Sequence, residues 1–395
     1  MIKIVFFLMI AFSGLFSMKS NAQWVLSLTQ SSSSWSMVNK NTSLLAGAVN
    51  GIYFTDNLGI TWNFKNCPAS YVRSIVVRDS IIFITSDFNG VFKSMDNGNT
   101  WTSINFGITN PSQAWSLTQN DSLLILGTSG SFAGDTASIY ISSDNGAIWT
   151  KVFSLGTSEV FYSFAVSGDE VFAGVLHSGL FYSNDKGVTW ALHHAVISAK
   201  HIALSDTNLL CGITGGSGGI YLSTDKGFSW VNVLPLYYGH AFASSGNFTY
   251  AGTSNGFYYS IDNGYTWIQD NYGLPVNSGI ISICVIDSVI FIGTTNAEIY
   301  KRTIADIVLG VNVVITPHAD LNVFPNPGNN ILNIQNNSFY DIQFTLYNTT
   351  GIKLIDKIVT HNESTINISA FSDNIYYYNF IIDQQVVKSG ILIKQ

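Results

Sequence analysis

The sequence predicts an all-β protein, and three observations lead to that fold class. Six similar eight-residue segments recur 37 to 48 residues apart. Short runs rich in Ile, Val, Phe and Tyr alternate with Gly, Asn, Asp and Ser, and the repeats show no helical periodicity. A period near 40 residues with several short strands per unit is typical of a propeller blade. We therefore predict a seven-bladed β-propeller followed by a small Ig-like β-sandwich.

Each octet has Ser or Thr first, usually Asp third, Gly fifth and Trp last. The third-position side chain can accept backbone N–H bonds across a tight turn, and the Gly permits a positive φ. Six copies around a ring point in six directions, so we predict a scaffold role, with metal binding or catalysis as the alternatives. The third positions are Asn57, Asp96, Asp144, Asp185, Asp225 and Asp262.

The number of blades follows from the repeating units. Residues 281–302 repeat the first three strands of a unit without an octet, which makes a seventh unit. The segment Trp24–Leu28 precedes the first complete unit and has no other partner. We predict that it supplies the missing outer strand and closes the ring, which removes two exposed sheet edges.

The octets resemble the Asp box of the BNR repeat, which occurs in sialidases, sortilin-like receptors, xyloglucanase-type glycosidases and photosystem II assembly factors. The resemblance covers about residues 24–305 and implies a propeller, with no single function. Two octets depart from the pattern, the first with Asn57 in place of Asp and the third with Ile148 in place of Thr.

A candidate binding site comes from aligning the units on the residue that ends the second strand. Twelve positions earlier, six of seven units carry an aromatic or basic residue, and Ile281 stands in the seventh. We predict that these side chains ring one mouth of the channel, with His201, Tyr237, Tyr238 and Tyr272 nearby in loops. Aromatic rings with polar tips suit a glycan or a protein side chain; packing of the channel mouth is the alternative. The six residues are Trp35, Arg73, Trp115, Tyr162, Lys200 and His240.

Catalysis has weaker support in the sequence. A sialidase-like site would require three converging arginines, and Arg73, Arg78 and Arg302 are the only arginines of the chain. We expect no catalytic residue, metal or cofactor, and interpret the propeller as a non-enzymatic binding or scaffold module for a glycan or surface protein. The alternative is a carbohydrate-active glycoside hydrolase of the Asp-box propeller type.

The rest of the chain predicts export. Residues 1–22 combine Lys3, an apolar run and the small-residue site Ser20-Asn21-Ala22, as in a secretory signal peptide; a retained anchor is the alternative. We assign the propeller to residues 23–305, a linker to 306–320 and the sandwich to 321–395. No later segment is long and apolar enough to predict a membrane span. The net charge of −7 argues against nucleic acid as a partner.

The sandwich segment resembles the type A C-terminal sorting domain of the Bacteroidota type IX secretion system. The matching features are Val323-Phe324-Pro325-Asn326-Pro327, Leu346-Tyr347-Asn348-Thr349-Thr350-Gly351, Asn374-Ile375-Tyr376 and Ile391-Leu392-Ile393-Lys394. The resemblance implies that the type IX machinery is a partner and that the protein reaches the cell surface or the medium. An ordinary Ig-like accessory domain is the alternative.

Overall fold

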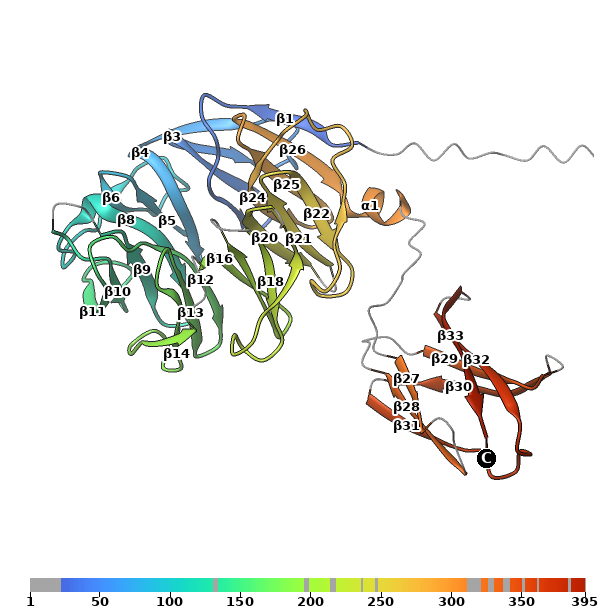
Figure 1. The fold of residues 1–395 in the computed structure, drawn as a ribbon. Coiled ribbons are helices and arrows are strands. Elements are labelled where there is room, and N and C mark those ends of the chain that lie inside the picture. Colours follow the sequence, from blue (N-terminus) through green and yellow to red (C-terminus); the bar gives the residue numbers. More distant parts are fainter. Residues whose placement is uncertain are drawn as a thin grey trace, which may run out of the picture.

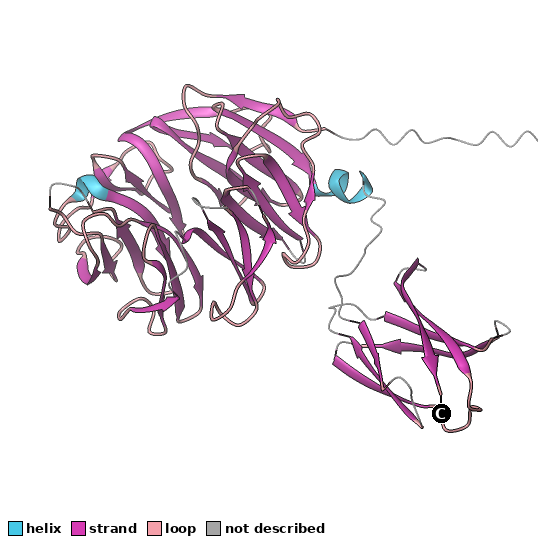
Figure 2. Cartoon of the chain, in the orientation of Figure 1, coloured by secondary structure: helices cyan, strands magenta, loops and turns pink. Residues whose placement is uncertain are grey.

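The computed structural model describes residues 23–130, 134–194, 199–213, 218–235, 237–245, 248–310, 321–325, 330–336, 342–349, 352–360, 362–382 and 385–394. Within these residues the chain consists mainly of strands, as Figure 2 shows, so the predicted all-β class is confirmed. The predicted signal peptide and the linker residues 311–320 lie outside the described residues.

The first two sheets are joined by one long strand, β4 (Asn63–Arg78), and the first sheet contains a second long strand, β3 (Ser43–Thr55). The start of β3 pairs with β2 (Met37–Lys40), and its end pairs with the start of β4. The end of β4 then pairs with β5 (Ile81–Ser86), which begins a second sheet. Each of the two long strands therefore takes the place of two consecutive strands of the repeating pattern. The second sheet continues with β6 (Gly90–Ser94) and β7 (Thr102–Ser103).

Five further four-stranded sheets follow in chain order. The third and fourth contain β8 (Ala114–Gln119), β9 (Leu124–Thr128), β10 (Ser138–Ser142), β11 (Thr150–Ser154), and β12 (Phe161–Ser167), β13 (Glu170–Val175), β14 (Gly179–Ser183), β15 (Ala191–His194). The fifth and sixth contain β16 (Ala199–Ser205), β17 (Asn208–Ile213), β18 (Gly219–Ser223), β19 (Val231–Leu234), and β20 (Gly239–Ser245), β21 (Phe248–Thr253), β22 (Gly256–Ser260), β23 (Ile268–Gln269). The seventh contains β24 (Ile280–Ile286), β25 (Val289–Thr294), β26 (Glu298–Thr303) and β1 (Val25–Thr29).

The seven sheets form a closed ring. The innermost strands β4, β8, β12, β16, β20 and β24 contact one another in succession, and β2 contacts both β4 and β24. Figure 1 shows the sheets arranged around a common axis, with these strands toward the centre. A short 3-10 turn, η1 (Pro111–Gln113), leads into β8. The arrangement is that of a propeller, and the seven sheets match the seven predicted units.

The hydrophobic core lies between neighbouring blades. For example, Phe172 and Leu180 of the fourth blade pack in one cluster with Ile202 and Cys211 of the fifth. Similar clusters join the other blades, so each sheet covers an apolar face of its neighbour. An isolated blade would expose that face to water, which costs about 25 cal/mol per Å² of apolar surface.

The N-terminal strand closes the ring, as predicted. Strand β1 pairs antiparallel with β26, from Val25 opposite Lys301 to Thr29 opposite Glu298. Just before it, Trp24 is 1% exposed, its backbone N–H donates to the Tyr272 carbonyl at 2.9 Å, and its Nε1 donates to the Asp270 carbonyl at 2.9 Å. The first residues of the described chain are thus bonded to both the sixth and the seventh blade.

A helix that the sequence did not predict follows the last blade. Helix α1 (Ile304–Gly310) begins after β26, where Thr303 Oγ1 accepts a bond from the Asp306 N–H. Its Ile307 is 1% exposed and belongs to the core cluster that contains Trp24 and Tyr300. Residues from 306 were expected to form a linker, but Ile307 belongs to the propeller core. Seven residues are too few to display a helical period in the sequence.

The C-terminal residues form two sheets around a separate core. One sheet contains β27 (Leu321–Phe324), β28 (Ile331–Asn336) and β31 (Asn362–Asn367), and the other contains β29 (Ile342–Tyr347), β30 (Lys353–Val359), β32 (Ile375–Ile382) and β33 (Gln385–Ile393). Leu332 and Ile334 of the first sheet pack with Phe344 and Phe380 of the second. This is a β-sandwich, and its strands follow the apolar runs of the sequence.

Closure by Trp24 can be tested by truncating its side chain. The Trp24→Ala substitution removes a buried indole and its hydrogen bond, so we expect the free energy of unfolding to fall by about 3–5 kcal/mol. The neighbouring Val25 is 51% exposed, so Val25→Ala is the matched control, with an expected change below about 0.5 kcal/mol. Urea titration followed by tryptophan fluorescence and circular dichroism measures both. Equal losses in the two variants would contradict the role assigned to Trp24.

Candidate functional site

A β-bulge lies near the start of six innermost strands and explains why the aligned positions coincide in space. In each strand the pairing register skips one residue, for example between Val72 and Ser74 in β4. A bulge leaves the extra residue without a pairing partner and redirects its side chain. The skipped residues are Arg73, Trp115, Tyr162, Lys200, His240 and Ile281.

The glycines used for the alignment lie beside the bulge of the next blade. A Cβ atom built on Gly174 would lie 2.6 Å from the Ala199 carbonyl oxygen, and one on Gly212 would lie 2.4 Å from the Gly239 carbonyl oxygen. Real side chains do not approach a carbonyl so closely, so only glycine fits. The inner strands of neighbouring blades can therefore come together at the level of the bulges.

Serines that follow the bulges hold neighbouring inner strands together. Ser74 Oγ donates to the Leu117 carbonyl at 3.1 Å, and Ser116 Oγ donates to the Phe161 carbonyl at 2.6 Å. Ser282 Oγ makes the same kind of bond, at 2.6 Å, to the Ser34 carbonyl across the ring closure. These bonds fix the backbone that carries the redirected side chains.

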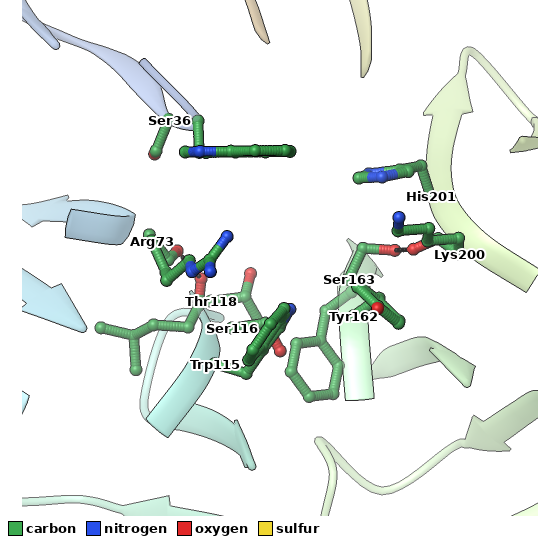
Figure 3. Close-up of a pocket in the computed structure, with 13 residues that line it drawn as sticks. Ser36, Arg73, Trp115, Ser116, Thr118, Tyr162, Ser163, Lys200 and His201 are labelled. Carbon is green, nitrogen blue, oxygen red and sulfur yellow. Dashed lines mark hydrogen bonds between the residues drawn. The ribbon is translucent and has the colours of Figure 1, made fainter. Parts of the chain in front are cut away.

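The bulged residues of β4, β8, β12 and β16 line a cavity of about 500 Å³, which Figure 3 shows. The structure brings five of the six predicted residues to its wall, and His240 is next to it, with its ring centroid 6.2 Å from that of His201. The buried Ile281 does not reach the cavity. The lining residues are Trp35, Ser36, Arg73, Ser74, Trp115, Ser116, Leu117, Thr118, Tyr162, Ser163, Phe164, Lys200 and His201.

Several neighbours of the site were placed wrongly or missed. His201 was expected in a loop, but it lies in β16 and lines the cavity. Tyr237 packs against Tyr258, and Tyr272 is 57% exposed away from the lining. Phe164 and Thr118 were not predicted at all. Phe164 is two residues after the bulged Tyr162, and Thr118 is three residues after the bulged Trp115. Both positions follow from the strand register, which the repeat alignment of the sequence gives.

Cations and aromatic rings alternate along the wall of the cavity. The Arg73 guanidinium carbon lies 5.3 Å from the Trp35 ring centroid and 4.5 Å from that of Trp115. Trp115 meets Tyr162 edge to face at 5.4 Å, and the Lys200 ammonium lies 4.8 Å from the Tyr162 centroid. The electron-rich ring faces attract the cations and help to hold them in place. The five side chains thus form one continuous row of contacts.

The two cations differ in their partners. Arg73 donates through Nε and Nη2 to the carboxylate of Asp87, at 2.7 to 2.9 Å. Lys200 has no carboxylate partner in the part of the chain that the structure describes. Its pKa is lowered, first by burial and then by the charge of Arg73. The cavity therefore has an excess of positive charge.

The other two arginines are held far from this row by their own partners. Arg302 forms an ion pair with Asp270 at 2.7 Å, and Arg78 donates to Gln119 Oε1 at 3.1 Å. Only Arg73 lines the cavity, so the described residues do not assemble three arginines around one ligand.

The two histidines are neutral at pH 7. Burial, together with the charges of Lys200 and His240, lowers the pKa of His201 to about 3. Burial and Lys200 lower the pKa of His240 to about 4. Because an unfolded histidine has a pKa of about 6.5, the unfolded chain binds more protons below that pH. The free energy of unfolding should therefore decrease as the pH falls from about 6.5 toward 4.

The octet turns, defined as the six eight-residue segments ending in Trp, make the contacts expected of scaffold turns. Asp185 Oδ1 accepts the Val188 and Thr189 N–H groups at 3.1 and 2.8 Å, and its Oδ2 accepts the Thr189 hydroxyl at 2.6 Å. Ser183 Oγ donates to Oδ1 at 2.7 Å and accepts from the Gly187 N–H at 2.9 Å. None of the six third-position residues lines the cavity.

The two atypical octet turns keep most of these bonds. Asn57 Oδ1 accepts the Thr61 N–H at 3.0 Å, as Asp does in a regular turn. Its Nδ2 donates to the Thr61 hydroxyl at 2.8 Å, whereas in a regular turn the hydroxyl donates to the Asp carboxylate. In the third turn Asp144 accepts the Ile148 N–H at 3.0 Å and has no hydroxyl at that position to bond. In a regular turn, the Thr100 hydroxyl and N–H bonds lower the pKa of Asp96 to about 2. In all three turns, N–H groups of the octet find their acceptor on the third-position side chain of the same octet.

Comparison with known proteins adds to the sequence argument. Residues 322–394 match the family described as the secretion system C-terminal sorting domain, so the tail is a sorting domain for export to the cell surface or the medium. No curated protein matches this sequence. Among the described residues, no helix is long and apolar enough to cross a membrane.

Solved structures support the propeller fold at low sequence identity. YCF48 from Cyanidioschyzon merolae has a TM-score of 0.58 and 15% identity, over 72% of this chain and 99% of that one. YCF48 bound to D1 peptide has a TM-score of 0.57 and 15% identity, over 71% and 95%. The GH74 enzyme of Niastella koreensis has a TM-score of 0.54 and 16% identity, over 80% and 60%. These similarities establish the fold and no function.

Protonation of the histidine pair can be measured by NMR. We expect the imidazole signals of His201 and His240, assigned with the His201→Gln and His240→Gln variants, to titrate below about pH 5 in the folded chain. In urea the same residues should titrate near pH 6.5. The double variant should also lose part of the decline in unfolding free energy between about pH 6.5 and 5. Folded-state midpoints above about pH 6 would contradict the burial argument.

The scaffold role of the octet turns predicts a stability effect without a binding effect. Asp185→Ala removes the acceptor of four hydrogen bonds within the turn, so we expect a loss of about 1–3 kcal/mol in unfolding free energy. Asp169, 68% exposed and paired only with Lys186 at 3.5 Å, provides the control, since Asp169→Ala should cost less than about 1 kcal/mol. Urea titration compares the variants. Loss of ligand affinity at unchanged stability would contradict the scaffold role.

Proposed function

We propose that the exported propeller is a non-enzymatic binding module that holds a glycan or protein ligand in the cavity at the channel mouth. The observation that carries the proposal is the row of five contacting side chains, Trp35 through Lys200, that faces this cavity. Aromatic and cationic side chains are the groups that most often anchor ligands in recognition sites. The sorting tail places the module outside the cell, where a surface glycan or protein is available.

The composition of the wall favours binding over hydrolysis. Glycoside hydrolysis usually needs two carboxyl groups that flank the scissile bond. Among the described residues, the cavity wall contains no Asp or Glu, and the nearby Asp87 carboxylate is engaged by Arg73. The wall offers hydrogen-bond donors and ring surfaces, which suit recognition.

A glycoside hydrolase is the second candidate, because the propeller is similar to the Niastella koreensis GH74 enzyme. The chain covers 60% of that enzyme. An active site on this chain would therefore have to be built from fewer residues than that enzyme has.

The two candidates can be separated with one protein preparation. The chain from residue 23 onward is applied to a glycan array and to a panel of surface-protein extracts, and the same sample is assayed for release of reducing sugar. We expect binding without hydrolysis, and an affinity at least about tenfold lower for the Trp115→Ala/Tyr162→Ala double variant. The exposed Tyr272→Ala variant is the control. Hydrolysis would support the second candidate, and affinity unchanged by the double substitution would assign the row to packing.

A further inference from the structure

The cavity lining has unused hydrogen-bond donors and few unused acceptors. Lys200 Nζ and Arg73 Nη1 make no hydrogen bond within the described chain, and the same holds for Trp35 Nε1, Trp115 Nε1 and Tyr162 Oη. The hydroxyls of Ser74, Ser116 and Ser163 are engaged by backbone groups of the next blade. A complementary ligand must therefore present acceptor oxygens.

The cavity also selects for charge. Arg73 and Lys200 point into the same space from opposite sides, as Figure 3 shows. Asp87 neutralises one of the two charges, and the second has no described counter-charge. Holding an unpaired ammonium in a partly desolvated site is unfavourable unless a ligand supplies the anion. The unmatched charge, in a chain with a net charge of −7, marks the position where an anionic group would be stabilised.

We propose, on the basis of the binding function above, that the ligand is an acidic glycan and that the cavity binds a uronic acid residue. Its carboxylate lies between Arg73 Nη1 and Lys200 Nζ, and its ring contacts the exposed parts of Trp115 and Tyr162. Charge-assisted bonds from an ammonium and a guanidinium to a carboxylate are the strongest hydrogen bonds such a wall can form.

The shortage of acceptors distinguishes a sugar from a peptide. A peptide in the cavity brings backbone N–H groups that can only donate, and the described wall offers them no free carboxylate and few free oxygens. A sugar hydroxyl can rotate to accept a bond from the indole N–H or the tyrosine hydroxyl. The carboxylate and the ring oxygen accept only. The wall is therefore matched to an oxygen-rich anion.

The test compares oligosaccharides that differ only in charge. Isothermal titration of the chain from residue 23 onward is carried out with oligogalacturonate, oligomannuronate and oligoguluronate, and with their methyl esters, which retain the sugar rings and lose the charge. We expect at least one acid to bind, with an affinity at least about tenfold above that of its ester. The affinity should fall as salt is raised, because screening weakens the charge contact.

Substitutions at Lys200 test whether its charge carries the effect. Lys200→Met keeps most of the length of the side chain and removes the charge, so it should lower affinity for the acid about tenfold or more and affinity for the ester by a smaller factor. Lys200→Arg should retain most of the binding. Lys151→Met is the control, because Lys151 lies over the Tyr140 ring outside this cavity. Thermal melting verifies that each variant is folded.

The outcomes separate this inference from the broader proposal. Equal affinity for acid and ester, lost in the Trp115→Ala/Tyr162→Ala variant, would overturn the uronic acid inference and leave the binding function standing. Absence of binding to all three acids, or binding of acidic peptides alone, would overturn it as well. If neither the array nor the titrations detect a ligand that depends on Trp115 and Tyr162, both proposals fail.

Discussion

The pairing of β1 with β26 is the interaction on which the propeller depends. Each blade covers only part of its apolar surface by itself, so the ring is stable only if its first and last blades meet. The joint is made by residues far apart in sequence: Trp24 bonds the Asp270 carbonyl, and Ser27 Oγ bonds the Gly59 carbonyl at 2.8 Å. One short strand therefore connects the sixth, seventh and first blades. Without it two sheet edges would be exposed to water and to pairing with other chains.

The inner strands connect this closed scaffold to the cavity. The same types of residue determine the backbone and the wall in most blades: glycine permits close approach, serine bonds the neighbouring strand, and the bulge turns one side chain inward. Six blades repeat the pattern at β4, β8, β12, β16, β20 and β24. The repeat can therefore vary the bulged residue without altering the scaffold. This explains how a regular architecture has a wall on which Arg73, Trp115, Tyr162 and Lys200 are all different.

The sequence was sufficient to predict the blades, the closure and the row of five side chains in the wall, because all three follow from a repeating local pattern. Counting twelve residues back from Gly127 or Gly174 reaches the bulged residue regardless of what that residue is. Other features depend on contacts between segments with no shared pattern. Nothing in the sequence near Asp87 indicates that it will pair with Arg73. Similarly, α1 is too short to show a period, and its place is set by Ile307 filling a gap in the core.

The distribution of charge in the cavity is an argument for the recognition role that we propose. Bulged residues selected only for packing would be aliphatic, as in the seventh blade, where Ile281 is buried. Instead, in a chain with only three arginines, one of them and a lysine line the same cavity, and the charge of Arg73 lowers the pKa of Lys200. The aromatic rings reduce this cost by cation–π contact but do not neutralise either charge. Sites that keep charges in an unfavourable arrangement are more often functional than structural. The ring closure, the octet turns and the interblade serines hold the scaffold together, and none of them uses the ammonium of Lys200, for which we therefore propose an anionic ligand as the partner.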